Sequence, residues 1–142
     1  GQKLPVTGTI FVSVQDIDKE AVLPVASQFR DMGFIIVATR GTAAFLEEHG
    51  ILNNIIHKVS TGRPHVVDAI KNGEIQMIVN TGSGDKPRHD GYMIRRAAIK
   101  YNIPYVTTIA GVKAMCRGIW ALKKGTLSVK TIQEYNGAQK RG

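Results

Sequence analysis

Polar side chains follow five apolar runs of the sequence, at the points where the strands of a parallel sheet would end. The set consists of lysines, threonines and one asparagine: Lys19, Thr39, Thr42, Lys58, Asn80, Thr81, Thr107 and Thr108. Ammonium groups and hydroxyls donate hydrogen bonds, so together they suit an anion such as a phosphate. Open α/β sheets bind their ligands outside the carboxyl ends of the strands. The spacing therefore predicts one anion-binding rim along one sheet edge.

The segment 39–42, Thr-Arg-Gly-Thr, leads straight from an apolar run into a helical pattern. Its backbone N–H groups and two hydroxyls can converge on an oxyanion, and Gly41 permits close approach. The alternative is that Thr42 only caps the helix. Lys19 favours an anion site, because a cation in the first turn of a helix opposes the helix dipole by ~0.3–1 kcal/mol unless an anion offsets it. Lys58 would approach the same anion from another strand end.

Asn80 and Thr81 open a glycine-rich turn after a further apolar run. This turn matches neither a Walker loop nor a dinucleotide fingerprint, because no Lys-Ser/Thr pair follows at the required spacing. Asn80 could present a donor and an acceptor to a base or a sugar, or it could form an Asx turn. Arg63, in a tight turn before a helical pattern, could make a bidentate contact to an oxyanion or simply lie at the surface.

The histidines and the cysteine give no sign of a metal site. The histidines are His49, His57, His65 and His89. Their spacing is not that of metal ligands, so we expect no metal ion. His89 and Asp90 could form an acid–base pair, but an aspartate at a helix start is more commonly a cap. Cys116 is the only cysteine, which excludes an internal disulfide, and its apolar neighbours indicate a core residue.

The elements that must position these residues follow from apolar periodicity. Strands are predicted over residues 6–14, 34–38, 54–59, 76–79 and 104–107. Helices are predicted over residues 19–32, 66–71, 90–101 and 112–122, and a short one follows the turn 39–42 and ends at residue 48. Asp16 to Asp18 should cap the first helix, and Pro24 should kink it or displace its first turn. The pattern favours no element over residues 128–135. Strands that alternate with helices imply right-handed crossovers, a parallel sheet and a single three-layer α/β/α domain over residues 1–142.

Length and charge limit the classes of function. The chain has 142 residues and a net charge of +8, with seven basic and seven acidic residues up to position 71 and twelve basic and four acidic residues after it. A basic half can indicate nucleic acid or anionic metabolites, or only a solvated surface. We expect no nucleic-acid partner, because no aromatic stacking platform accompanies the basic residues. No apolar stretch reaches the ~20 residues that span a bilayer, so we expect a cytoplasmic protein without a membrane contact.

Taken as an ordered set, the motifs resemble those of the methylglyoxal synthase-like family, in particular its allosteric domains at the C-terminus of carbamoyl phosphate synthetase large subunits. The segments that carry the resemblance are 18–20, 38–43, 58–59, 62–65, 70–73, 80–81, 94–96 and 107–108. They span nearly the whole chain. The family fold is a five-stranded parallel sheet of order 3-2-1-4-5, which agrees with the predicted strand count.

The resemblance implies a nucleotide monophosphate as effector, uridylate as inhibitor and inosinate as activator in some bacterial members. The positions that would hold its phosphate are Lys19, Thr39, Thr42 and Lys58, and those that would face its nucleoside are Asn80, Thr81 and Asp90. Thr107 matches a position that contacts ornithine where the domain meets the synthetase body. The resemblance assigns no catalytic residue and no cofactor to the domain itself.

The parent enzyme that the resemblance implies is a glutamine-hydrolysing ligase. It uses ATP and Mg²⁺ to form carbamoyl phosphate for pyrimidine and arginine biosynthesis. Its partners would be the other synthetase domains, a small glutaminase subunit and possible further copies, and residues 1–142 would be a fragment of the longer chain. The alternative within the family is methylglyoxal synthase, which eliminates phosphate from dihydroxyacetone phosphate. It is disfavoured because Arg63 stands where that enzyme needs an aspartate base, and a cation cannot abstract the substrate proton.

Overall fold

The computed structural model describes residues 4–57, 65–82 and 89–141, with the backbone alone for residues 89–90 and 126–141. Five strands form one sheet: β1 (Thr9–Val14), β2 (Ile35–Ala38), β3 (Asn54–Ile55), β4 (Met77–Thr81) and β5 (Tyr105–Val106). All the strand pairs are parallel, and the order is β3-β2-β1-β4-β5. The predicted sheet and its order are therefore confirmed.

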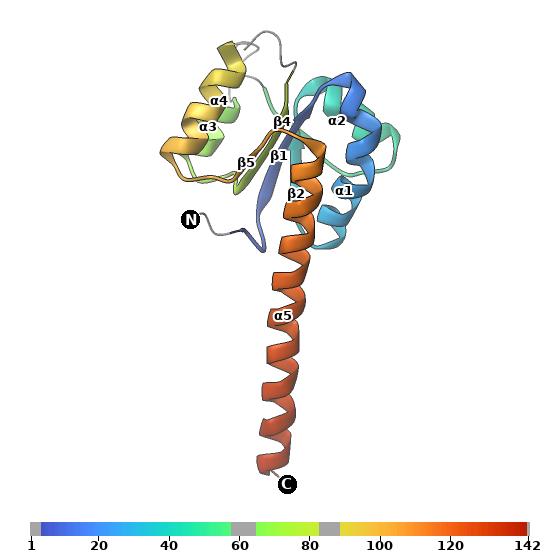
Figure 1. Ribbon diagram of the computed structural model, residues 1–142, viewed down its shortest axis with the longest axis vertical. Helices are drawn as coiled ribbons and strands as arrows, with labels where there is room; N and C mark the ends of the chain where they lie inside the picture. The colour runs from blue at the N-terminus through green and yellow to red at the C-terminus, as the bar shows by residue number, and fades with distance from the viewer. Residues whose placement is uncertain (1–3, 58–64, 83–88, 142) are drawn as a thin grey trace.

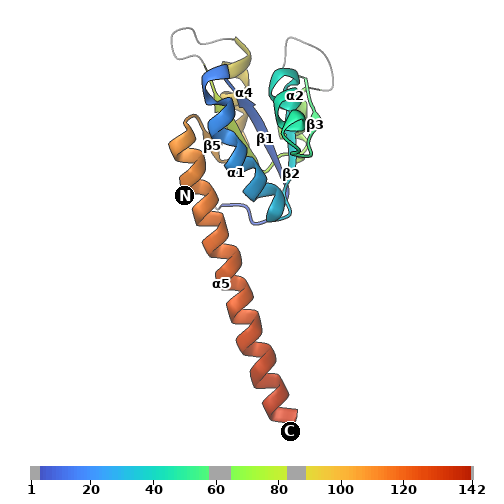
Figure 2. The ribbon, with the colours of Figure 1, turned by 90° about the vertical axis from the view of Figure 1, so that its right-hand side faces the viewer.

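The helices cover the sheet on both faces (Figures 1 and 2). They are η1 (Asp16–Asp18), α1 (Lys19–Asp31), α2 (Arg40–Glu48), α3 (Val66–Lys71), α4 (His89–Lys100) and α5 (Ile109–Arg141), with η1 a single 3₁₀ turn. One core cluster joins Ile10, Val12 and Val14 of β1 to α1, α2 and α5. Another joins Phe11 to α3 and α4. Successive side chains of a strand point to opposite faces, so β1 supplies both cores and the architecture has three layers.

The first helix begins differently from the prediction. Asp18 is the residue before α1, but its side chain makes no capping hydrogen bond. Instead it accepts a hydrogen bond from the Gln15 side chain at 3.0 Å. The single turn η1 precedes α1, and Pro24 lies inside α1. Gly33 follows the helix with φ +96°, a conformation that favours glycine and lets the chain turn into β2.

Several further boundaries differ from the prediction, among them the start of β1 at Thr9 and the two-residue strand β5. Strand β3 is two residues long instead of six, and Ile35 at the start of β2 is 48% exposed. Asp90 lies inside α4, which the structure describes from His89, so the cap interpretation is wrong for Asp90. Helix α5 runs to Arg141 instead of ending at residue 122, and it projects beyond the sheet (Figures 1 and 2). No helix among the described residues is long and apolar enough to cross a membrane.

Candidate anion-binding site

The candidate site lies at the carboxyl edge of the sheet, where the ends of β1, β2 and β4 come level. Val12 pairs with Ala38 on one side and with Val79 on the other. The residues that follow in each strand therefore reach the same height, and the Thr39 hydroxyl donates a hydrogen bond to the Ser13 hydroxyl at 3.1 Å. Both side chains are buried. A pair of hydroxyls that shares one hydrogen bond keeps one hydrogen for another acceptor.

Thr42 ties helix α2 to the end of β1. Its hydroxyl accepts a hydrogen bond from the backbone N–H of Val14 at 3.2 Å, and the residue is only 3% exposed. The residue before the helix is Thr39, and its side chain makes no capping bond. The interpretation of Thr42 as a helix cap is therefore wrong, and its hydroxyl joins two elements instead.

Lys19 lies beside the turn that opens α2. A Cβ atom built on Gly41 would stand 3.7 Å from the Lys19 ammonium nitrogen, so α1 and the start of α2 meet here without a bulky side chain between them. The same nitrogen lies 2.8 Å from a carboxylate oxygen of Asp16. The Lys19 side chain is 22% exposed and that of Asp16 is 96% exposed, so water and solutes reach this ion pair. The hydrogen bond and the charge of Lys19 hold the pKa of Asp16 below its ordinary value.

Asn80 and Thr81 lie on the β4 side of the edge. The Asn80 amide nitrogen donates a hydrogen bond to the Tyr105 hydroxyl at 3.0 Å, and it lies 3.9 Å from a Cβ position built on Gly91 near the start of α4. The backbone N–H of Gln15 is shared between the carbonyl oxygen and the hydroxyl of Thr81, both at 3.1 Å. The Thr81 hydroxyl therefore fixes the loop after β1, and Asn80 faces β5 and α4.

A model of the MGS-like domain matches residues 21–107, which is more than half of the chain. The chain belongs to the MGS-like domain family. The carbamoyl phosphate synthase large chain of a Nostoc strain is 50% identical over 135 residues, which are 95% of this chain and 12% of that protein. The protein of the same name from Archaeoglobus fulgidus is 48% identical over 96% of this chain and 13% of its own length. The C-terminal section from Methanopyrus kandleri is 45% identical over 96% of this chain and 25% of that section. This MGS-like domain therefore spans an eighth to a quarter of the relatives that it matches.

Solved structures are similar in fold. Methylglyoxal synthase from Elizabethkingia anophelis superposes with a TM-score of 0.64 at 16% identity, over 80% of this chain and 79% of the other. The protein ForH superposes with a TM-score of 0.58 at 15% identity, over 78% of each chain. At this level of identity the likeness concerns the arrangement of the sheet and its helices.

The edge of this MGS-like domain brings together most of the residues that the sequence singled out. Lys19, Thr39 and Thr42 lie around the start of α2, whereas Asn80 and Thr81 lie across β1 from them. Thr107 follows β5 directly and is exposed. Lys58, Arg63 and the side chain of Asp90 lie outside the described residues. Within the described part, no group of three or more His, Cys, Asp or Glu side chains could hold a metal ion.

Three further residues of the MGS-like domain belong to this edge and were missed by sequence reasoning. Ser13 pairs with Thr39, Tyr105 accepts from Asn80, and Asp16 forms the ion pair with Lys19. The three-residue spacing of Asp16 and Lys19 was the one local signal available. Ser13 and Tyr105 meet their partners only through strand register, which no local pattern encodes.

Proposed function

We propose that this MGS-like domain is the regulatory domain of a carbamoyl phosphate synthase large chain, and that it binds a nucleotide monophosphate through the phosphate at the start of α2. The relatives named above support the parentage, because 96% of this chain matches a part of the C-terminal section of a large chain. The parent would be an ATP- and Mg²⁺-dependent, glutamine-hydrolysing ligase of pyrimidine and arginine biosynthesis in the cytoplasm. Residues 1–142 would be one folded unit within it.

The observation that carries the phosphate proposal is the position of the Lys19 ammonium group beside Gly41. The first N–H groups of a helix have no carbonyl partner within the helix. In α2 the first to bond back is Ala43, to the Thr39 carbonyl oxygen at 2.7 Å. The N–H groups of residues 40–42 precede that bond, so they can converge on an anion beside Lys19.

The strength of such a contact favours a phosphate over a weaker ligand. A hydrogen bond to a charged group contributes ~1.5–3 kcal/mol, and the positive end of the helix dipole adds to the attraction. Lys19 would contribute one such bond. The Ser13 hydroxyl, whose hydrogen is not used in the bond from Thr39, would contribute another. Lys58, which follows β3 by three residues in the sequence, is proposed to complete the phosphate site, and Thr42 to line it.

The remaining contacts of the effector are proposed along the β4 side of the edge. Asn80, Thr81 and Asp90 would face the nucleoside, and Thr107 would contact ornithine where the domain meets the synthetase body. Regulation would require the effector to bind one state of the large chain and its glutaminase partner more tightly than the other, by ~1–3 kcal/mol for a typical coupling.

Isothermal titration calorimetry tests the phosphate site directly. We expect heat with uridylate or inosinate, and none with uridine or inosine, because the nucleosides lack the phosphate. Lys19→Met should weaken binding ~10- to 150-fold, the equivalent of one lost charge-assisted hydrogen bond. Lys124→Met is the matched control, because Lys124 lies about 22 Å along α5 from its first turn. Absence of heat with both nucleotides at millimolar concentration would refute the proposal.

The same preparation should release no methylglyoxal from dihydroxyacetone phosphate. The fold is shared with methylglyoxal synthase, but Arg63 offers no base for the proton transfer. Turnover of dihydroxyacetone phosphate that persists in Lys19→Met would contradict both the regulatory proposal and the assigned phosphate site.

A further inference from the structure

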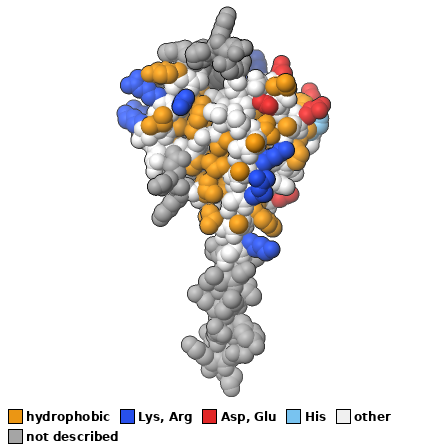
Figure 3. All heavy atoms as spheres, in the orientation of Figure 1, with side chains coloured by type: hydrophobic (Ala, Val, Ile, Leu, Met, Phe, Trp, Pro, Cys, Tyr) orange, Lys and Arg blue, Asp and Glu red, His pale blue; other side chains and the backbone are white. Residues whose placement is uncertain are grey.

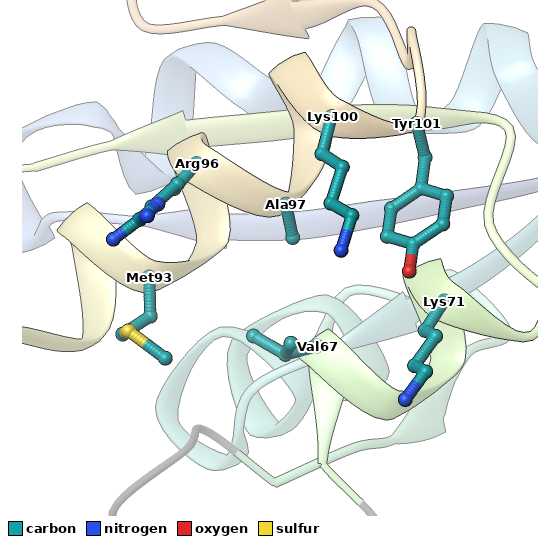
Figure 4. A pocket seen from close by; sticks show the side chains of 7 residues that line it. All are labelled: Val67, Lys71, Met93, Arg96, Ala97, Lys100 and Tyr101. Atoms are coloured by element: carbon teal, nitrogen blue, oxygen red, sulfur yellow. The ribbon is translucent and has the colours of Figure 1, made fainter.

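A groove of about 330 Å³ lies between α3 and α4 (Figure 4). Its lining residues are Val67, Lys71, Met93, Arg96, Ala97, Lys100 and Tyr101. On α4, residues 93, 96, 97 and 100 share one side of the helix over a length of about 10 Å. Helix α3 supplies the opposite wall. The groove is therefore an open channel between two helices that already pack together.

The floor of the groove is apolar and partly exposed. Val67, Met93 and Tyr101 are half-buried, and Ala97 between them is buried. An apolar surface of this kind, hollowed and unfilled, suits an aliphatic side chain from a partner. The Lys100 ammonium nitrogen lies 5.5 Å from the centre of the Tyr101 ring, so a charge stands beside the apolar floor.

The rim of the groove is basic. Lys71, Arg96 and Lys100 are all exposed, and none of the seven lining residues is acidic. The ion pairs found among the described residues are those of Lys19 with Asp16 and of His65 with Asp68, so they leave these three cations without a carboxylate. Figure 3 shows basic side chains over α4 with no acidic side chain among them, whereas on the side of α1 and α5 basic and acidic side chains are mixed.

We propose that the groove between α3 and α4 is a docking site for an acidic amphipathic helix of a partner protein. An aliphatic side chain of the partner would fill the apolar floor, and carboxylates on either side of it would meet Lys71 on one wall and Arg96 and Lys100 on the other. About two turns of helix match the length of the groove. None of the lining residues belongs to the proposed phosphate site, so either proposal can be refuted without refuting the other.

Charge decides between the possible occupants. A second copy of this chain carries the same net charge of +8, which opposes association at a basic surface. A nucleic acid would satisfy the cations, but the lining offers one aromatic ring, Tyr101, for stacking. An acidic helix satisfies both the cations and the apolar floor.

Fluorescence anisotropy with a synthetic peptide tests the proposal. The probe is a labelled helical peptide of about 14 residues with leucine on one face and glutamate on both flanks. We expect the peptide to bind the 142-residue chain at physiological salt. Its affinity for the double variant Arg96→Glu/Lys100→Glu should be at least about tenfold lower. The control Lys113→Glu/Lys124→Glu makes the same charge change at exposed positions of α5 and should leave the affinity unchanged.

Three results would overturn the proposal. The first is equal binding by the parent and the Arg96/Lys100 variant, and the second is equal binding of a peptide with lysine in place of each glutamate. The third is that binding of a labelled oligonucleotide, or self-association in sedimentation, depends on Arg96 and Lys100, whereas binding of the acidic peptide does not. Circular dichroism confirms that each variant is folded, and an unchanged uridylate titration shows that the phosphate site is intact.

Discussion

The substitution Thr42→Val removes one hydroxyl from the carboxyl edge and keeps nearly the same volume. The Thr42 hydroxyl accepts the backbone N–H of Val14 at 3.2 Å, and both residues are buried. Without the hydroxyl, that N–H is left buried and without its acceptor, which costs ~1–3 kcal/mol. We therefore expect the free energy of unfolding to fall by that amount.

The same loss can be expressed as a shift of the melting temperature. The entropy of unfolding near 60 °C is roughly 0.3 kcal/mol/K for 142 residues, so Thr42→Val should lower the Tm by about 3–10 °C. Urea unfolding followed by circular dichroism gives the free energy, and a calorimetric scan gives the Tm. Thr7→Val is the matched control, because Thr7 is exposed and a surface change should stay within ~0.5 kcal/mol.

Thr42→Ser separates the hydroxyl from the methyl group. Serine keeps the acceptor for Val14 and loses one methyl, worth ~0.8 kcal/mol when buried. The expected order of stability is Thr, then Ser, then Val. If the valine variant were as stable as the unaltered protein, the bond between α2 and β1 would contribute nothing, and the account of Thr42 as a tie between elements would be refuted.

Three more outcomes are expected. Asp16→Asn should tighten uridylate binding roughly two- to fivefold, because the exposed carboxylate no longer competes for Lys19. Calorimetry measures the affinity, with Glu20→Gln as the control variant, and weaker binding by Asp16→Asn would contradict the competition. Gly41→Ala should leave the fold intact, because the new Cβ would meet only the Lys19 ammonium nitrogen at 3.7 Å, yet it should weaken uridylate binding by narrowing the approach to the turn; unchanged affinity would remove the phosphate from this turn. Burial raises the pKa of the Cys116 thiol, so less of it is thiolate at pH 8 and it should react with a thiol reagent far more slowly in the native protein than in urea; equal rates would show that the core opens around α5.

Apolar periodicity was sufficient for the main elements, and it located α3 at the residues predicted, Val66–Lys71. Alternating elements with short connections leave few topologies, which is why the parallel sheet could be predicted. The length of α5 could not be predicted, because residues 128–135 carry no clear periodic pattern and yet continue the helix.

The candidate site was predicted as a set of residues and not as a set of contacts. Polar residues after strands were expected on one sheet edge, and the structure places Thr39, Thr42 and Asn80 there, since strand ends on one sheet edge are neighbours. The role of Thr42 was wrong at the sequence level, because its partner Val14 lies 28 residues earlier and no local pattern relates the two. Asp16 was taken for part of a cap, whereas its carboxylate contacts Lys19 one turn later.

The central strand β1 has consequences for how the chain is made. Its partner β4 follows 67 residues later, as the contact between Thr9 and Gln76 records, and no two strands of this sheet form a hairpin. A nascent chain leaving the ribosome therefore exposes one edge of β1, with its unpaired backbone N–H and C=O groups, until residues 77–81 have emerged. Such long-range pairing slows folding and prolongs the interval in which that edge can aggregate.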